Sequence, residues 1–126
     1  MLDPVIHQAT RLRIMAALFR NREASFTRLR DALDLTDGNL GSHAAALEKA
    51  GYIDSRRVLS GLSFEVRYRI TPAGSAAFVD YTQELQALLS APAELDAAPL
   101  HEEPDARHGR EERDRERDEA RGAREA

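Results

Sequence analysis

Apolar and polar positions alternate with a helical period between residues 36 and 50. The apolar positions of this stretch recur on one helical face and are Leu40, Ala44 and Leu47. Thr36 precedes them and can accept a hydrogen bond from a free amide of the first turn, as an N-cap residue does. Gly51 follows them, where a helix end often requires a positive φ. The pattern therefore predicts a helix over residues 36–50 with one buried face.

The first 20 residues carry two apolar stripes at helical spacing. One stripe contains Leu12, Met15, Ala16 and Phe19, and the other contains Ile14 and Leu18. A helix that is apolar on two sides is buried on two sides. Asp3 and Pro4 predict its start, because proline suits the first helical position. Thr10 offers a second N-cap, so the alternative is a helix that bends or breaks near residues 8–10. We expect this helix to contact the rest of the domain on one side and a second copy of the chain on the other.

Two more helices are predicted on either side of a stretch with a different period. Ser25 caps a short helix whose apolar positions are Phe26, Leu29 and Leu33. Thr71 and Pro72 begin a last helix that reaches about Ser90, with apolar positions at Phe78, Tyr81, Leu85, Leu88 and Leu89. This last stripe indicates a dimer surface; the alternative is that it packs on the first helix of its own chain.

The period changes from 3.6 to 2 after Gly51. Residues 64–70 alternate between apolar side chains (Phe64, Val66, Tyr68, Ile70) and charged ones, which predicts a half-buried strand. Residues 52–59 form a weaker strand, and the two are expected to pair as an antiparallel hairpin with its tip at 60–63. Alternation places Arg67 and Arg69 on the face away from the core. Residues 21–24 are predicted to be a polar connection.

The two helices over 25–33 and 36–50, joined by a turn at Asp34 and Leu35, have the form of a helix-turn-helix. The face of the second helix opposite its apolar stripe has only small or hydrogen-bonding side chains: Gly38, Asn39, Ser42, His43 and Lys49. We interpret this helix as a recognition helix for double-stranded DNA. The whole order predicts a mainly α fold with a small β-hairpin, a winged helix-turn-helix (α-α-α-β-β-α) with a charged C-terminal tail.

The net charge of −4 is unevenly distributed over the 126 residues. Residues 1–90 carry 11 Lys and Arg against 10 Asp and Glu, whereas residues 91–126 carry 7 against 12. The front part is therefore close to neutral, and the basic footprint usual for a nucleic-acid binder is weak. From Ala91 onward the composition cannot supply a core. We predict a winged helix domain over 1–90 and a disordered polyampholyte tail over 91–126 that adds solubility.

Composition also argues against several classes of function. The chain has no cysteine, so it has no disulfide framework, thiolate zinc site or cysteine nucleophile. The four histidines, at positions 7, 43, 101 and 108, show no ligand spacing: His7, His43, His101 and His108. No phosphate loop, serine elbow or carboxylate pair marks an active site. No apolar run approaches the roughly 18 residues of a membrane span, and the N-terminus does not resemble a signal peptide. We expect a cytoplasmic protein that is not an enzyme, with no metal, cofactor or membrane partner.

Several short motifs together resemble the small bacterial winged-helix transcriptional regulators near the MarR and ArsR types. They cover residues 2–90 and are Asp3-Pro4 with His7-Gln8, the segment 10–14, the segment 35–40, the segment 47–52 and the segment 69–74. The resemblance implies a homodimer that places one recognition helix of each subunit in successive major grooves, with the wings touching the flanking backbone. No residue marks a pocket for a small-molecule effector.

Carried over to this sequence, the resemblance implies specific contacts. Asn39, Ser42 and His43 are expected to reach base edges, because such side chains pair with them. The N-terminus of the same helix, at Thr36, Asp37 and Gly38, suits a phosphate. Further DNA contacts are expected from Lys49, Arg56, Arg57, Arg67 and Arg69. Dimer contacts are expected from Leu12, Met15, Phe78, Tyr81, Leu85 and Leu88.

The hairpin tip departs from the pattern of these regulators. They commonly carry Lys or Arg there, whereas this chain has an apolar Leu62 and Phe64 within residues 60–65. An alternative hypothesis follows: a winged-helix module that binds proteins without sequence-specific DNA binding.

Overall fold

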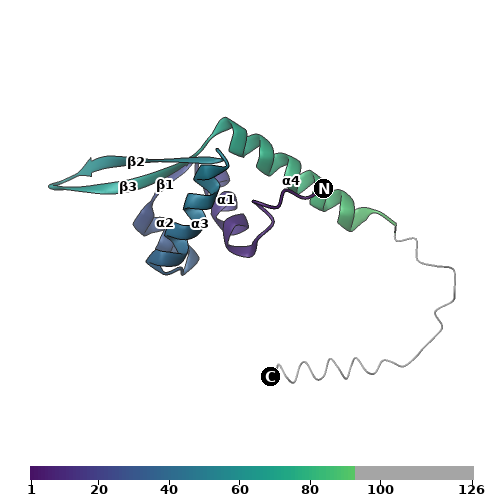
Figure 1. Ribbon diagram of the computed structural model, residues 1–126, viewed down its shortest axis with the longest axis horizontal. Helices are drawn as coiled ribbons and strands as arrows, with labels where there is room; N and C mark the ends of the chain where they lie inside the picture. The colour runs from purple at the N-terminus through teal and green to yellow at the C-terminus, as the bar shows by residue number, and fades with distance from the viewer. Residues whose placement is uncertain (93–126) are drawn as a thin grey trace, which may run out of the picture. The chain divides into compact units, whose positions relative to one another are not determined.

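The computed structural model describes residues 1–92, which form four helices and three strands (Figure 1). In chain order these are α1 (Ala9–Asn21), β1 (Glu23–Ser25), α2 (Phe26–Leu33), α3 (Asp37–Lys49), β2 (Ile53–Ser60), β3 (Ser63–Ile70) and α4 (Pro72–Ser90). The order confirms the predicted winged helix fold. The tail predicted over 91–126 lies almost wholly outside the described residues.

Short-range signals set the ends of α2, α3 and α4 as predicted. Ser25, Thr36 and Thr71 are N-caps whose hydroxyl oxygens accept from the third amide along, at 3.1, 3.1 and 2.9 Å. Asp34 takes the left-handed conformation after α2, with φ 57°, and Gly51 has φ 82° after α3. Each of the three N-caps satisfies an amide that the first helical turn leaves free, so the helices begin where their sequences place them.

The first helix does not begin at Pro4, and the alternative of a break near residues 8–10 is confirmed. Asp3 Oδ1 accepts from the amides of Val5 and Ile6, at 2.8 and 3.4 Å, but this closes only an isolated turn. Gln8 is extended, with φ −150°, and its side-chain oxygen accepts from Arg11 N at 2.8 Å. Because an extended residue cannot continue a helix, α1 begins at Ala9. The N-cap is thus Gln8 and not Thr10.

A third strand occupies the segment that was predicted to be a polar connection. β1 pairs antiparallel with β3, Ala24 opposite Tyr68, and the sheet order is β1-β3-β2. Three residues are too few to show a period of 2, so periodicity could not predict this strand. This strand brings Glu23 beside the outer face of the hairpin.

The hydrophobic core lies between the helices and the near end of the sheet. It is formed by Ile6, Ile14, Met15, Leu18, Leu29, Leu40, Ala44, Leu47, Ile53, Tyr68, Ile70, Phe78 and Tyr81. The predicted apolar face of α3 is therefore confirmed. Phe64 was predicted on the buried face but is 60% exposed, because the hairpin projects beyond the helices that cover its base (Figure 1).

The predicted dimer surface is corrected at three positions. Met15, Phe78 and Tyr81 are buried in the core that α1 and α4 share, so they are not available to a partner. α4 packs on α1 of its own chain, the alternative left open above. Of the other predicted dimer residues, Leu12 and Leu85 are half-buried and Leu88 is exposed.

One hydrogen bond ties the N-terminal segment to the start of the hairpin. The hydroxyl of Tyr52 donates to the carboxylate of Asp3. This bond, together with partial burial and the nearby negative charge, raises the pKa of Tyr52 from its usual 10 to about 12. Ionising Tyr52 would remove the donor and place two negative charges together, so the folded state favours the protonated phenol.

The Tyr52→Phe variant is expected to be less stable by about 1–2 kcal/mol at neutral pH, since a hydrogen bond to a carboxylate is lost. Because the pKa is raised in the folded state, the stabilisation is complete below pH 10 and is lost as the pH rises from 10 to about 12. Urea denaturation across that range should show a steeper decline for the natural chain than for the variant, which keeps only the contribution of Tyr68. Parallel declines would contradict a role for Tyr52.

Candidate nucleic-acid interface

The side of α3 that faces away from the core is polar, small and solvent-exposed. Its exposed residues include five of the predicted DNA contacts: Asp37, Gly38, Asn39, Ser42 and Lys49. The cap residue Thr36 is exposed as well. A Cβ added at Gly38 or Gly41 would meet no other atom within 4 Å, so packing within the described chain does not require glycine at either position. This face of α3 is therefore exposed to solvent and is not covered by other side chains of the described chain.

His43 is placed differently from the other predicted base contacts. It is half-buried at the edge of α3 that faces α1, where Arg11 Nη1 lies 3.3 Å from His43 Nδ1. Arg11 is itself held by a hydrogen bond of 2.5 Å from its Nε to the carbonyl of Val5. The histidine ring thus has a partner within its own chain and lies at the flank of the exposed face.

A salt bridge fixes the start of α3 relative to α2. Arg30 Nη1 donates to Asp37 Oδ1 at 2.9 Å, and the same guanidinium pairs with Asp31 at 2.9 Å. The hydrogen bonds that Arg30 donates to Asp37 and then to Asp31 raise the pKa of Arg30, so the guanidinium stays charged. Arg30 is a residue that sequence reasoning missed, because no spacing rule links residues on opposite sides of a turn.

Three of the four predicted wing arginines are held by carboxylates on the outer face of the sheet. Glu23 pairs with both Arg56 and Arg67, each at 3.3 Å. Glu65 pairs with Arg67 at 3.0 Å, and Asp54 pairs with Arg69 at 3.7 Å. The hydrogen bond that Arg67 donates to Glu65 is the main reason that the pKa of Arg67 is raised. The outer face of the wing therefore carries three positive and three negative charges.

Arg57 lies on the opposite face of the hairpin. Its guanidinium carbon is 4.7 Å from the centre of the Phe64 ring, within the range of a cation–π contact. Among the carboxylates of residues 1–92, none forms an ion pair with Arg57 or with Lys49. These two cations are the predicted DNA contacts that carry unneutralised charge.

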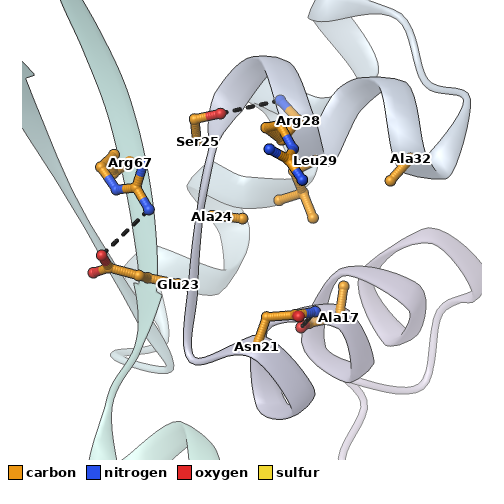
Figure 2. Close-up of a pocket in the computed structure, with 9 residues that line it drawn as sticks. All are labelled: Ala17, Asn21, Glu23, Ala24, Ser25, Arg28, Leu29, Ala32 and Arg67. Carbon is orange, nitrogen blue, oxygen red and sulfur yellow. Dashed lines mark hydrogen bonds and ion pairs between the residues drawn. The ribbon is translucent and has the colours of Figure 1, made fainter. Parts of the chain in front are cut away.

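A cavity of about 310 Å³ lies beside the ion pairs of Glu23, between α1, β1, α2 and β3 (Figure 2). Figure 2 shows the Arg67 guanidinium turned toward the Glu23 carboxylate and the Ser25 hydroxyl bonded to the amide of Arg28. The remaining lining residues are Ala17, Asn21, Ala24, Leu29 and Ala32. Glu23 thus borders both the cavity and the wing.

The described part of the chain offers neither a metal site nor a membrane span. Within residues 1–92, no three His, Cys, Asp or Glu side chains are grouped closely enough to hold a metal ion. None of the helices there combines the length and apolar character needed to cross a bilayer.

Known proteins resemble this chain over the region just described. The family model for the winged helix DNA-binding domain matches residues 10–89. The uncharacterized protein MJ0432 of Methanocaldococcus jannaschii is 30% identical over 81 residues, which cover 64% of this chain and 88% of that protein. The transcriptional regulator homologue protein from Pyrococcus horikoshii OT3 is 30% identical, with a TM-score of 0.65 over 68% of this chain and 84% of that one.

A more distant likeness is to the structure of overoxidized AbfR bound to DNA. The identity is 15% and the TM-score 0.59, over 86% of this chain and 69% of that one. At this identity the likeness shows a shared fold.

Proposed function

The chain belongs to the family of winged helix DNA-binding domains, and on that premise we propose that it is a transcriptional regulator that binds double-stranded DNA as a homodimer. The observation that carries the proposal is the exposed face of α3, which is polar, small and not covered by any other part of residues 1–92. A helix of this kind fits the major groove. The similar Pyrococcus protein, described as a transcriptional regulator homologue, supports the same function.

Each part of the exposed face has a distinct proposed role. Asn39 and Ser42 offer amide and hydroxyl groups to base edges, and His43 contacts DNA from the flank. The amides at Thr36, Asp37 and Gly38 point toward a phosphate at the helix N-terminus, where Arg30 already balances the Asp37 carboxylate. Lys49 extends toward the backbone at the other end of α3.

The wing arginines are proposed to differ in how readily each one binds a DNA phosphate. Arg57 can bind a phosphate directly, because no carboxylate within residues 1–92 pairs with it. Arg56, Arg67 and Arg69 must each exchange a carboxylate for a phosphate. We therefore expect Arg57 and Lys49 to supply most of the charge, which gives about four phosphate contacts in a homodimer.

Salt dependence tests this proposal. Fluorescence anisotropy with a duplex from the region upstream of its own gene should show affinity that falls as salt rises, because bound protein displaces counterions. With four contacts the slope of log K against log salt should be about −4. Binding to no duplex, even at low salt, would contradict the proposed function.

The homodimer is proposed to form through the exposed end of α4. Leu88 and Leu89 are exposed there, at 62% and 76%, and the last turns of α4 extend beyond the helices that cover its start (Figure 1). Leu12 and Leu85, both half-buried, lie at the edge of the core. Sedimentation velocity at micromolar concentration should report a dimer, and a monomer would contradict this part of the proposal.

A second candidate function is favoured by one specific observation. The tip of the wing is apolar and exposed, and the outer-face arginines are neutralised, as expected of a protein-binding module. The double variant Lys49→Ala with Arg57→Ala separates the two functions, because these two cations are expected to supply most of the charge that binds DNA. Weaker DNA binding by an intact dimer supports the regulator, whereas unchanged DNA binding with loss of a protein partner supports the module.

The Glu23→Gln variant is expected to bind duplex DNA about 3- to 10-fold more tightly. The substitution removes the carboxylate that holds Arg56, so this guanidinium becomes available to a phosphate, whereas Arg67 keeps its second partner Glu65. The salt slope should steepen by about one for each protomer. Anisotropy at several salt concentrations measures both quantities.

Asp80→Asn is the matched control, because it makes the same charge change at an exposed position of α4. It is expected to change the affinity by less than about twofold, as a distant surface charge is largely screened. If Glu23→Gln binds no more tightly than this control, the carboxylate does not compete with DNA.

A further inference from the structure

Exposed large hydrophobic side chains are concentrated at the end of the β2–β3 hairpin. Leu59, Leu62 and Phe64 are 65%, 105% and 60% exposed, and we call these three residues the wing tip. Burying a side chain of this size typically yields about 1.5–3 kcal/mol, so leaving three together in water is costly. The cluster therefore needs an explanation other than folding.

The pairing of the two strands places the wing tip at the far end of the hairpin. The two strands stay paired up to Ser60 and Ser63, which leaves Gly61 and Leu62 as the turn. Gly61 has φ 64°, the conformation needed at the first position of a tight hairpin turn. Leu62 is thus the outermost side chain. Because the strands on both sides of the turn are paired, the backbone that carries Leu62 needs little further ordering when this side chain makes a contact.

The register places an apolar pair and one cation on the same face. Leu59 lies opposite Phe64, and Arg57 lies opposite Val66 on that face, with its guanidinium over the Phe64 ring. The three other wing arginines lie on the opposite face, among carboxylates. An apolar point beside one unneutralised cation is complementary to a base-pair stack next to a phosphate.

We propose that the wing tip inserts Leu62 as an apolar wedge between base pairs of the bound duplex, with Arg57 on the neighbouring phosphate. The inference rests on the proposed DNA binding. Leucine and phenylalanine wedges of this kind unstack a base step and bend the duplex. The cation favours a polyanion over a protein partner. The wedge should act best at pyrimidine–purine steps, because these unstack easily. The wing would thus favour DNA sequences whose base steps are easy to deform.

The test uses the full chain and a duplex from upstream of its own gene that carries 2-aminopurine beside a TA step. Unstacking of this base raises its fluorescence. We expect the natural protein to raise the signal, and Leu62→Ala to abolish the rise and weaken binding about 10-fold with an unchanged salt slope. Arg57→Ala should instead reduce the slope by about one per protomer, because one phosphate contact is lost.

Val79→Ala is the matched control, since Val79 is an exposed aliphatic side chain on α4, outside the hairpin and outside the proposed dimer surface. It should leave the fluorescence rise intact. If Leu62→Ala binds DNA as the natural protein does, the wedge is overturned; a simultaneous loss of an oligomer would assign the tip to a second copy. If the natural protein binds no duplex at any salt concentration, the proposed function itself fails.

Discussion

Replacing Ser42 with glutamate is expected to weaken duplex DNA binding by at least about 100-fold. Ser42 lies on the exposed face of α3, opposite the buried Leu40, Ala44 and Leu47. A carboxylate at this position would meet the phosphates and base acceptors of the major groove, and juxtaposed like charges cost several kcal/mol. Anisotropy with the upstream duplex at low salt measures the loss.

Folding is not expected to change in this variant, because the side chain points into solvent. Gln83→Glu adds the same charge at an exposed position of α4 and serves as the control. Its affinity should stay within about twofold of that of the natural protein. An affinity loss of equal size in both variants would mean that only the net charge affects binding, and that α3 does not contact the DNA.

Replacing Gly74 with alanine is expected to destabilise the domain by about 3 kcal/mol. A Cβ at Gly74 would lie 2.0 Å from the carbonyl oxygen of Tyr52 and 2.8 Å from its carbonyl carbon. The same oxygen accepts from Thr71 N at 3.0 Å, so the backbone is fixed where α4 begins. The carbonyl belongs to the main chain, and the added Cβ is attached directly to the main chain of α4. The clash can therefore be relieved only if α4 moves. Thermal unfolding should show a melting temperature lower by more than about 10 °C.

Gly38→Ala provides the opposite case. Nothing lies within 4 Å of a Cβ at this position, and glycine within a helix costs about 0.5–1 kcal/mol relative to alanine. The variant should therefore unfold at a higher temperature than the natural chain. A similar loss of stability at both positions would show that the close approach at Gly74 is not the cause.

The parts of the fold that depend on neighbouring residues could be predicted from the sequence. Ser25, Thr36 and Thr71 cap helices through contacts that span three residues, and Gly51 takes its positive φ for the same local reason. The hairpin turn at Gly61 is equally local. Residue types and spacing suffice when every partner lies within one turn of the chain.

The parts that depend on distant residues could not be predicted. β1 exists because Glu23–Ser25 finds an edge of β3 more than 40 positions away. Gln8 is the N-cap of α1 because Gln8 itself is extended; Thr10 suggested a break near residues 8–10 but did not identify this cap. Periodicity marked Met15, Phe78 and Tyr81 as apolar but did not show which surface covers them.

The candidate interface shows the same division. The open face of α3 follows from its own period, whereas the neutralised arginines of the wing follow from Glu23, which no spacing rule connects to Arg56 or Arg67. Alternation predicted the face on which Arg67 and Arg69 lie but not the carboxylates beside them. Arg57 stands out only once these ion pairs are known.

The most direct measurement is a titration of the ¹⁵N-labelled full chain with the upstream duplex, followed by NMR. We expect the largest amide shifts at Thr36, Gly38 and Ser42 of the α3 face, with a second group at the wing tip. Unperturbed α3 amides at saturating duplex, or shifts confined to α4, would contradict the assignment of α3 as the helix that binds DNA.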